Sequence, residues 1–308
     1  MSESPAAASP YEVLGVSPSV TDAELRRAYR IKLRQSHPDV GGNAASFHEV
    51  QLAWERIGSP ESRAAYDGAR YAETAYSGAA RRSAPSARPS SVGVRARMYG
   101  HPGGYSRQRY LALLREWVGR GASIADPYAP DLIRSAPWEI RHRLAKALAE
   151  ESTAHLISGL GIGYTAWHDV ATRDDVEKID HLVLGPAGLF AILSEDWGSP
   201  VQLKRGELVG ASLEPGEEPL DEFATAARVL SKSLRVRFTA LIVVAPDETV
   251  TEPLSLPSRG RRPMVVVIPR SRLVGVLRDG IAGMERGSFE KVFELRSTLQ
   301  NGIRFVED

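Results

Sequence analysis

The consecutive residues His37, Pro38 and Asp39 place an imidazole and a carboxylate on either side of a proline. Proline confines the residue before it to extended geometry, so a helix that precedes these residues must end here. The glycines within residues 40–42 also favour a turn. We therefore predict a turn that presents two polar side chains. By itself such a tripeptide is most often only a turn, so its function depends on the elements around it.

A basic amphipathic helix is predicted directly before this turn, ending near Ser36. Thr21 and Glu24 have the spacing of a capping box, in which each side chain satisfies a backbone N–H at the start of the helix. The apolar stripe of this helix recurs at helical spacing and consists of Leu25, Ala28, Tyr29 and Leu33. The arginines outside the stripe form a positive face and are Arg26, Arg27, Arg30 and Arg34.

A second amphipathic helix is predicted after the turn, over residues 44–57. Its apolar positions repeat the same spacing and are Phe47, Val50, Ala53, Trp54 and Ile57. We expect this stripe to pack antiparallel on that of the preceding helix. A short first helix that ends at Gly15 and a short fourth helix after Pro60 complete the N-terminal pattern.

The N-terminal region resembles the J-domain of DnaJ-type co-chaperones. The residues that carry the resemblance are the opening Tyr11-x-x-Leu14-Gly15-Val16, Ala28-Tyr29-Arg30, His37-Pro38-Asp39, Phe47, Ala53-Trp54 and the closing Arg63-Ala64-Ala65-Tyr66-Asp67. The sequence departs from the family at Lys32, Ser36 and Gly58-Ser59. The Lys32 stem can lie on the helix pair while its amine stays in water. The resemblance implies an all-α J-domain of antiparallel helices over residues 9–71.

The resemblance also implies a partner, namely a DnaK-type chaperone whose ATP hydrolysis the domain stimulates. The chaperone-binding residues would be His37, Pro38, Asp39, Arg26, Arg27, Arg30 and Arg34. A positive helix face offers charge complementary to an acidic patch, which favours encounter and orientation. The alternative is that this face is only a solvated surface. The J-domain itself would carry no catalytic residue.

Composition limits the remaining possibilities. Hydrophobic residues make up 43% of the 308 residues, charged residues 25%, and the net charge is +1. No residue is a cysteine, which excludes disulfides, a cysteine nucleophile and a thiolate zinc module, and fits a cytoplasmic protein. The N-terminus lacks the apolar segment of a secretory signal, and no apolar run is long enough to span a membrane.

Residues 72–105 are rich in Ser, Pro, Gly and Arg and poor in aliphatic residues, so we predict a disordered basic linker. Over residues 72–109 the chain has seven arginines and one acid, Glu73. Arginines without interleaved aromatic residues can hold phosphates weakly but read no bases, so nucleic-acid contact through this linker stays open.

Residues 106–308 read as an α/β domain. Helical periodicity around Leu144 changes to strands near residues 164–170, 179–184 and 187–194, and then to a helix over 217–234. Two β-branched runs, 239–244 and 264–268, are typical of strands buried on both faces. Gly159, Gly161 and Gly163 do not form a dinucleotide-binding loop, because they follow a helix and position 164 is Tyr.

This order of elements resembles the nuclease-related domain (NERD), a branch of the restriction-endonuclease-like fold, with a core over about residues 149–280. The residues that carry the resemblance are Glu150, Trp167-His168-Asp169-Val170, Ile179-Asp180-His181-Leu182-Val183, Gly185-Pro186-x-Gly188-Leu189-Phe190 and Arg270-Ser271-Arg272-Leu273.

The resemblance implies a metal-dependent nuclease site whose key sequence is altered here. Active members hold Mg²⁺ with carboxylates and place a lysine in a Glu-x-Lys motif. Glu150 and Asp180 match acidic positions, but the motif reads Leu193-Ser194-Glu195, so the lysine is missing. We therefore expect no catalytic residue, and Glu150, Asp180 and Glu195 remain as degenerate candidates. His168 and His181 are expected to form local hydrogen bonds.

Three functions follow, and the first is preferred. The first is a co-chaperone without a cofactor, in which the NERD-like domain is an inactive targeting or interaction module. The second is a metal-dependent nuclease that uses Mg²⁺. The third is a nucleic-acid-binding protein that does not cleave. The sequence indicates no membrane partner, and it leaves the client and the oligomeric state open.

Overall fold

The structure, a computed structural model, describes residues 4–37, 42, 44–67, 95–119, 121–172, 178–204, 206–213, 218–256, 263–281 and 289–306. The chain divides into two units, a helical one that includes residues 7–67 and an α/β one that includes most residues from 95 onward. Among the described residues, no helix combines the length and the apolar character that crossing a bilayer requires. Pro38 and Asp39 lie outside the described residues.

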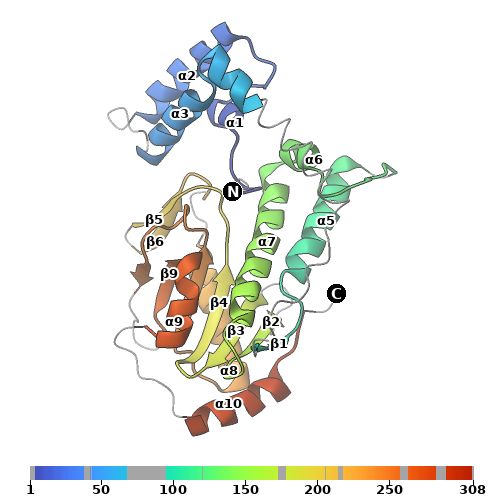
Figure 1. The fold of residues 1–308 in the computed structure, drawn as a ribbon, viewed down its shortest axis with the longest axis vertical. Coiled ribbons are helices and arrows are strands. Elements are labelled where there is room, and N and C mark those ends of the chain that lie inside the picture. The colour runs from blue at the N-terminus through green and yellow to red at the C-terminus, as the bar shows by residue number, and fades with distance from the viewer. Residues whose placement is uncertain are drawn as a thin grey trace. The chain divides into compact units, whose positions relative to one another are not determined.

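The helical unit consists of α1 (Pro10–Leu14), α2 (Asp22–Ser36), α3 (Ala44–Ile57) and a further helical segment over 60–67. The predicted capping box at the start of α2 is confirmed, because the Thr21 Oγ1 accepts from the Glu24 backbone and the Glu24 carboxylate accepts from Thr21 N at 3.0 Å. Figure 1 shows α2 and α3 side by side.

The predicted apolar stripes meet in the core of the helical unit. The fully buried members of this core are Tyr11, Leu14, Leu25, Val50, Ala53 and Ile57. Tyr29 and Trp54 add a stacked pair between α2 and α3, with ring centroids 4.3 Å apart. A Cβ at Gly15 would lie 3.2 Å from Lys32 Cε. The stem of Lys32 therefore lies along this region, as expected from its amphipathic character.

The helices of the α/β unit are α5 (Gly104–Val118), α6 (Pro130–Ser135), α7 (Trp138–Ser158), α8 (Pro219–Leu234), the 3₁₀ helix η2 (Arg270–Arg272), α9 (Leu273–Asp279) and α10 (Phe289–Gly302). The strands are β1 (Arg97–Tyr99), β2 (Thr165–Ala171), β3 (Lys178–Gly185), β4 (Gly188–Ser194), β5 (Val201–Lys204), β6 (Glu207–Gly210), β7 (Ala240–Ala245), β8 (Leu254–Leu256) and β9 (Val265–Pro269).

Seven of these strands form one mixed sheet in the order β1-β2-β3-β4-β7-β9-β8. The central strands β2, β3 and β4 are antiparallel neighbours, and β4, β7 and β9 run parallel. Strands β5 and β6 form a separate antiparallel pair. The register places His181 of β3 opposite His168 of β2 and Ile192 of β4, so the three strands lie side by side at this level.

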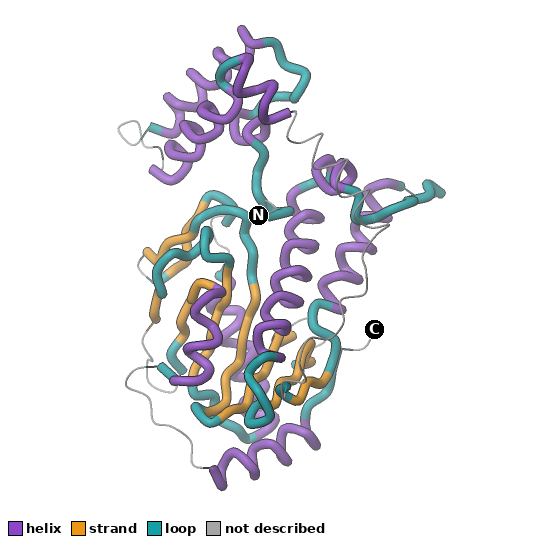
Figure 2. The backbone as a smooth tube through the Cα atoms, viewed as in Figure 1, coloured by secondary structure: helices purple, strands orange, loops and turns teal. Residues whose placement is uncertain are grey.

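Helices cover both faces of the sheet. Figure 1 and Figure 2 show α7 and α9 on one face and α8 on the other. One buried cluster joins Ile157 of α7 and Leu273 of α9 to Val183 and Ile242. The second cluster contains the inward face of α8, including Phe223 and Leu230, with residues of the same strands. The unit is therefore a mixed α/β structure with a three-layered core.

One predicted boundary needs correction. The linker was expected to extend to residue 105, but Arg97–Tyr99 pair with β2 and α5 begins at Gly104. The rest of that linker, residues 72–94, lies outside the described residues. Outside the range of about residues 149–280 over which the NERD resemblance was expected, Tyr110 of α5 and Leu299 of α10 are also fully buried. Amphipathic helices outside the sheet region thus complete the core.

Candidate functional site

Three polar residues on α7 begin the site, at intervals of four. Residues four apart lie on one face of a helix, and His142, Lys146 and Glu150 share the face that contacts Lys178 of β3 and Glu195, directly after β4. Glu150 is fully buried, and Lys146 is 9% exposed. Burying such groups is costly unless each finds a partner, so the neighbouring strands must supply counter-charges.

Asp180 of β3 lies at the centre of the cluster and is almost fully buried. Its Oδ1 faces Lys178 Nζ at 3.0 Å, whereas its Oδ2 accepts from Lys146 Nζ at 3.3 Å and from Ser194 N at 2.8 Å. Alternate residues of a strand lie on the same face, so Lys178 and Asp180 face the cluster together. One carboxylate therefore connects two lysines.

Lys178 has carboxylates on three sides. Its Nζ lies 2.5 Å from Glu150 Oε2, and it also donates to Asp169 Oδ1 in addition to pairing with Asp180. Asp169 has a positive φ of 49° within β2, a conformation that is uncommon for residues other than glycine. This backbone conformation accompanies the turn of the Asp169 carboxylate toward the lysine.

Lys146 occupies the other side of Asp180. Its ammonium donates to Glu195, to Asp180 and, at 3.3 Å, to the backbone oxygen of Ser194. A lysine ammonium has three donors, and all three have acceptors here. Glu195 also lies 3.4 Å from His142 Nε2 through its second oxygen. The negative charge that replaces the expected lysine at position 195 is thus paired with an ammonium from α7.

The close packing of these charges shifts their pKa values. Burial raises the pKa of Glu150 to about 8, and the charge of Asp180 adds to the rise, against the lowering effect of both lysines. Burial also opposes ionisation of Asp180 and Glu195, but the lysine ammoniums outweigh it. Lys146 and Lys178 hold the pKa of Asp180 far below its ordinary value. Lys146, together with His142, brings the pKa of Glu195 to about 2.

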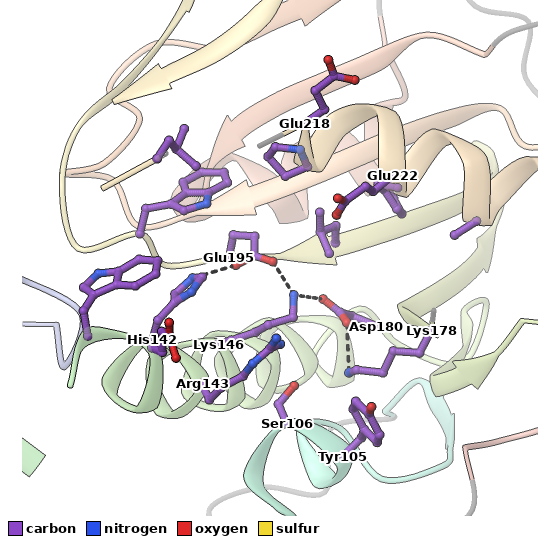
Figure 3. Close-up of a pocket in the computed structure, with 18 residues that line it drawn as sticks. Tyr105, Ser106, His142, Arg143, Lys146, Lys178, Asp180, Glu195, Glu218 and Glu222 are labelled. Carbon is purple, nitrogen blue, oxygen red and sulfur yellow. Dashed lines mark hydrogen bonds and ion pairs between the residues drawn. The ribbon is translucent and has the colours of Figure 1, made fainter. Parts of the chain in front are cut away.

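A pocket of about 490 Å³ opens onto this cluster. Lys146, Asp180 and Glu195 lie on its floor, and Figure 3 shows Glu218 and Glu222 of α8 on the opposite wall. Leu193 and Glu195 both line the pocket, because alternate residues of an extended segment lie on one face. The aromatic side chains Tyr105, Trp138, Trp197 and Phe223 form part of the remaining walls, together with polar and charged residues such as Arg143.

The residues present do not fit a divalent metal ion as they stand. Carboxylate oxygens are ligands that Mg²⁺ prefers, but the Lys178 ammonium already lies between Glu150, Asp169 and Asp180. An added divalent ion would lie against a like charge in a poorly hydrated site. In the parts of the chain that the structure describes, no group of three or more His, Cys, Asp or Glu side chains is arranged to hold a metal ion.

His168 and His181 hydrogen-bond to each other, with their Nδ1 atoms 2.7 Å apart. His181 Nε2 lies 3.1 Å from Ser194 Oγ, which donates to Thr153 Oγ1 at 2.9 Å. Burial lowers the pKa of His168 to about 4 and the pKa of His181 well below its ordinary value. These neutral side chains connect β2, β3, β4 and α7 behind the charged cluster.

The structure brings the three acidic candidates into one cluster, although they are far apart in sequence. Sequence reasoning missed Asp169, Lys146 and Lys178, which complete it. The spacing of Lys146 four residues before Glu150 was the available signal on the helix. The alternation of Lys178 with Asp180 was the signal on the strand.

The candidate chaperone-binding residues lie in the helical unit. All four arginines of the positive face, Arg26, Arg27, Arg30 and Arg34, are exposed on α2. His37 caps the C-terminal end of α2, and its ring contacts Phe47 edge-on with centroids 5.1 Å apart. The remaining two candidates, Pro38 and Asp39, are outside the described residues.

Arg63 is a further important residue of this unit, and sequence reasoning assigned it no role. Its Nε donates to Tyr11 Oη at 3.1 Å, and its Nη1 pairs with Asp22 Oδ1 at 2.9 Å. Its Nη2 donates to the backbone oxygens of Pro18 and Val20 at 2.9 and 2.7 Å. One guanidinium thus fixes the last helical segment to α1 and to the start of α2.

Comparison with known proteins assigns both units. The DnaJ domain model matches residues 9–67, and the nuclease-related domain model, NERD, matches residues 145–245. No solved structure gives a significant match.

Curated relatives match the chain over short stretches. The chaperone protein DnaJ of Erysipelothrix rhusiopathiae is 48% identical over 60 residues, which cover 18% of this chain and 16% of that protein. The DnaJ protein homolog 2 of Allium porrum is 46% identical over 57 residues, covering 18% and 14%. The human DnaJ homolog subfamily A member 2 is 42% identical over 64 residues, covering 20% and 15%. The chain thus spans less than a fifth of the length of these relatives.

Proposed function

Because the chain contains a DnaJ domain followed by a NERD domain, we propose that it is a co-chaperone that recruits a DnaK-type chaperone and stimulates its ATPase. The NERD domain would direct this activity to a target, as an interaction module without catalysis of its own. The proposal assigns chaperone binding to His37, to the two residues after it and to the arginines of α2.

The observation that carries the proposal is the combination of His37 at the end of α2 with an exposed basic face on the same helix. Phe47 supports the His37 ring from α3, so the core of the unit orients the start of the turn. Exposed arginines steer the approach of an acidic surface and fix its orientation. Contact would then favour the hydrolysis-competent state of the chaperone, as a shift of its populations.

The test is the single-turnover ATPase rate of a DnaK-type chaperone with the wild-type chain, with His37→Gln and with His48→Gln. His48 lies exposed on α3, so the same substitution there controls for a general loss of imidazole. We expect the wild type and His48→Gln to stimulate hydrolysis and His37→Gln to lose stimulation while keeping its helical circular dichroism. Full stimulation by His37→Gln would refute the proposed role of His37.

The pocket of the NERD domain supports an interaction role over cleavage of a polyanion. Both buried ammoniums are paired with carboxylates, and Glu139, Glu218 and Glu222 add negative charge to the pocket lining. A phosphodiester backbone would meet net repulsion at such a surface.

The element order α7, β2-β3-β4, α8, β7 supports the proposed relation to the restriction-endonuclease-like fold.

A metal-dependent nuclease remains the second candidate, because Lys146 does supply an ammonium next to Asp180 and Glu195. The test is incubation of the full chain with DNA or RNA in Mg²⁺ or Mn²⁺, with Asp180→Ala in parallel. We expect no cleavage by either protein. Cleavage by the wild type that disappears in Asp180→Ala would replace the interaction role with catalysis.

A further inference from the structure

Three carboxylates from three elements converge on the ammonium of Lys178. Glu150 comes from α7, Asp169 from β2 and Asp180 from β3, and the lysine side chain is only 8% exposed. Nζ lies 2.5 Å from the Glu150 oxygen and 3.0 Å from the Asp180 oxygen. Carboxylate oxygens are also the ligands that hard divalent cations prefer, although with the lysine in place the described residues form no group that would hold one.

In each of these three groups, the carboxylate oxygen that does not face Lys178 accepts a hydrogen bond from another part of the protein. Ser106 Oγ donates to Glu150 at 2.5 Å, the backbone N of Tyr105 donates to Asp169 at 3.1 Å, and the backbone N of Ser194 donates to Asp180 at 2.8 Å. The oxygens that face Lys178 are therefore positioned by groups other than the lysine itself. Their arrangement should persist when the ammonium is removed.

We propose that the Lys178 ammonium occupies the position that a divalent cation would take. The cation of this site is then a side chain of the protein and not a bound ion. An ammonium is a compact point charge with three donors, and it can satisfy three oxygens as a small ion does. The native cluster then takes up no metal ion, and the NERD domain keeps its fold and pocket without one. This inference does not depend on chaperone stimulation.

Lys146 does not have the same role. Its acceptors are two carboxylates and the backbone oxygen of Ser194, and it lies on the other side of Asp180. Its removal would leave Lys178 among its three carboxylates, so the cation position would stay filled. This difference provides a matched control on the same cluster.

The experiment measures Mn²⁺ binding by calorimetry on the metal-free full chain, for the wild type, Lys178→Ala and Lys178→Met. Alanine leaves space among the oxygens, whereas the unbranched methionine fills that space without charge. We expect Lys178→Ala to bind one Mn²⁺ at least a hundredfold more tightly than the wild type, and Lys178→Met to bind none. Lys146→Met should bind no better than the wild type.

Thermal unfolding gives a second readout if Lys178→Ala is poorly folded without metal. Mn²⁺ at a hundredfold excess over its dissociation constant should raise the midpoint of Lys178→Ala by roughly 5–10 °C and leave that of the wild type unchanged. The added substitution Asp169→Asn should remove the gain. The proposal is overturned if the wild type binds Mn²⁺ tightly at this cluster, or if Mn²⁺ neither binds nor stabilises Lys178→Ala.

Discussion

Asp180 connects the buried cluster, because each of its carboxylate oxygens faces a different lysine. Lys146 comes from α7 and Lys178 from β3, and Glu195 follows β4. Loss of one member of a buried ion pair costs about 3–5 kcal/mol, because the remaining charge loses its partner. We therefore expect these residues to constrain how α7 packs against the central strands, in addition to lining the pocket.

Glu150 makes the stability of the folded protein depend on pH, and the sign of this dependence follows from its pKa. Its pKa is raised to about 8 in the folded state, against an ordinary value near 4.5. The folded protein therefore binds the proton more tightly than the unfolded chain. The stability that this proton contributes is fully present below about pH 4.5 and is lost as the pH rises through about 8.

Substitution of Glu150 by Gln should remove this pH dependence, because the amide resembles the neutral carboxyl at every pH. Between pH 5 and 8 we expect the stability of the wild-type NERD domain to fall with a slope of up to about 1.4 kcal/mol per pH unit from this group. Denaturant unfolding of wild type and Glu150→Gln across this range measures the difference. Parallel pH profiles of the two proteins would contradict the assignment.

At the acidic end the dependence reverses, owing to Glu195 and Asp180, whose pKa values are both lowered. The pKa of Glu195 is lowered to about 2, so its contribution to stability is present above about pH 4.5 and is lost as the pH falls toward 2. Glu150→Gln should leave the loss of stability at acidic pH, the acidic limb, unchanged. Comparison of the two limbs in one titration thus separates Glu150 from the carboxyl groups whose pKa values are lowered.

Only part of the cluster could be predicted from the sequence. The resemblance identified Glu150, Asp180 and Glu195, because motif positions can be matched one by one. The same comparison with the Glu-x-Lys motif indicated that the site lacks a lysine ammonium, because it considered position 195 alone. Lys146 and Lys178 acquire their role from elements that meet only in the folded chain, and no local pattern fixes how α7 lies over β3.

The secondary structure shows the same division between local and tertiary causes. The apolar runs at β7 and β9 and the amphipathic pattern of α8 were predicted, because burial itself produces these patterns. The strands β1, β5, β6 and β8 were missed. Each has only three or four residues, and several of these are exposed. Such short segments become strands through pairing with a neighbour, which the local sequence does not record.

Arg63 shows how one side chain can fix the arrangement of several short helices. Its substitution by Ala should remove the bonds to Tyr11, Asp22 and the backbone before α2. We expect a loss of about 2 kcal/mol, because hydrogen bonds of charged groups contribute about 1.5–3 kcal/mol and this side chain is partly exposed. Denaturant unfolding followed by far-ultraviolet circular dichroism measures this change.

Arg27→Ala is the matched control for Arg63→Ala. Arg27 is exposed on α2, and exposed substitutions away from special features usually change stability by less than about 0.5 kcal/mol. Equal destabilisation by the two variants would mean that the contacts of Arg63 contribute little. A larger loss in Arg63→Ala would identify the guanidinium as a structural link, separate from the positive face proposed to bind the chaperone.

The whole chain combines two units with separate cores. The residues of the DnaJ core come from α1, α2 and α3, and those of the NERD core come from the sheet and the helices on it. When cores share no buried residues, a substitution in one should change the stability of that unit alone, since distant sites contribute additively.

Lys146→Met should lower the stability of the NERD domain by about 3–5 kcal/mol, because it leaves Asp180 and Glu195 with fewer partners. Arg63→Ala should shift only the unfolding of the DnaJ domain. Calorimetry on the full chain can follow both transitions, and chaperone ATPase can be measured on the same samples. We expect Lys146→Met to stimulate the ATPase fully below its lowered transition, since its DnaJ domain is intact. Loss of stimulation in that variant would show instead that the NERD domain takes part in chaperone activation and does not only direct it.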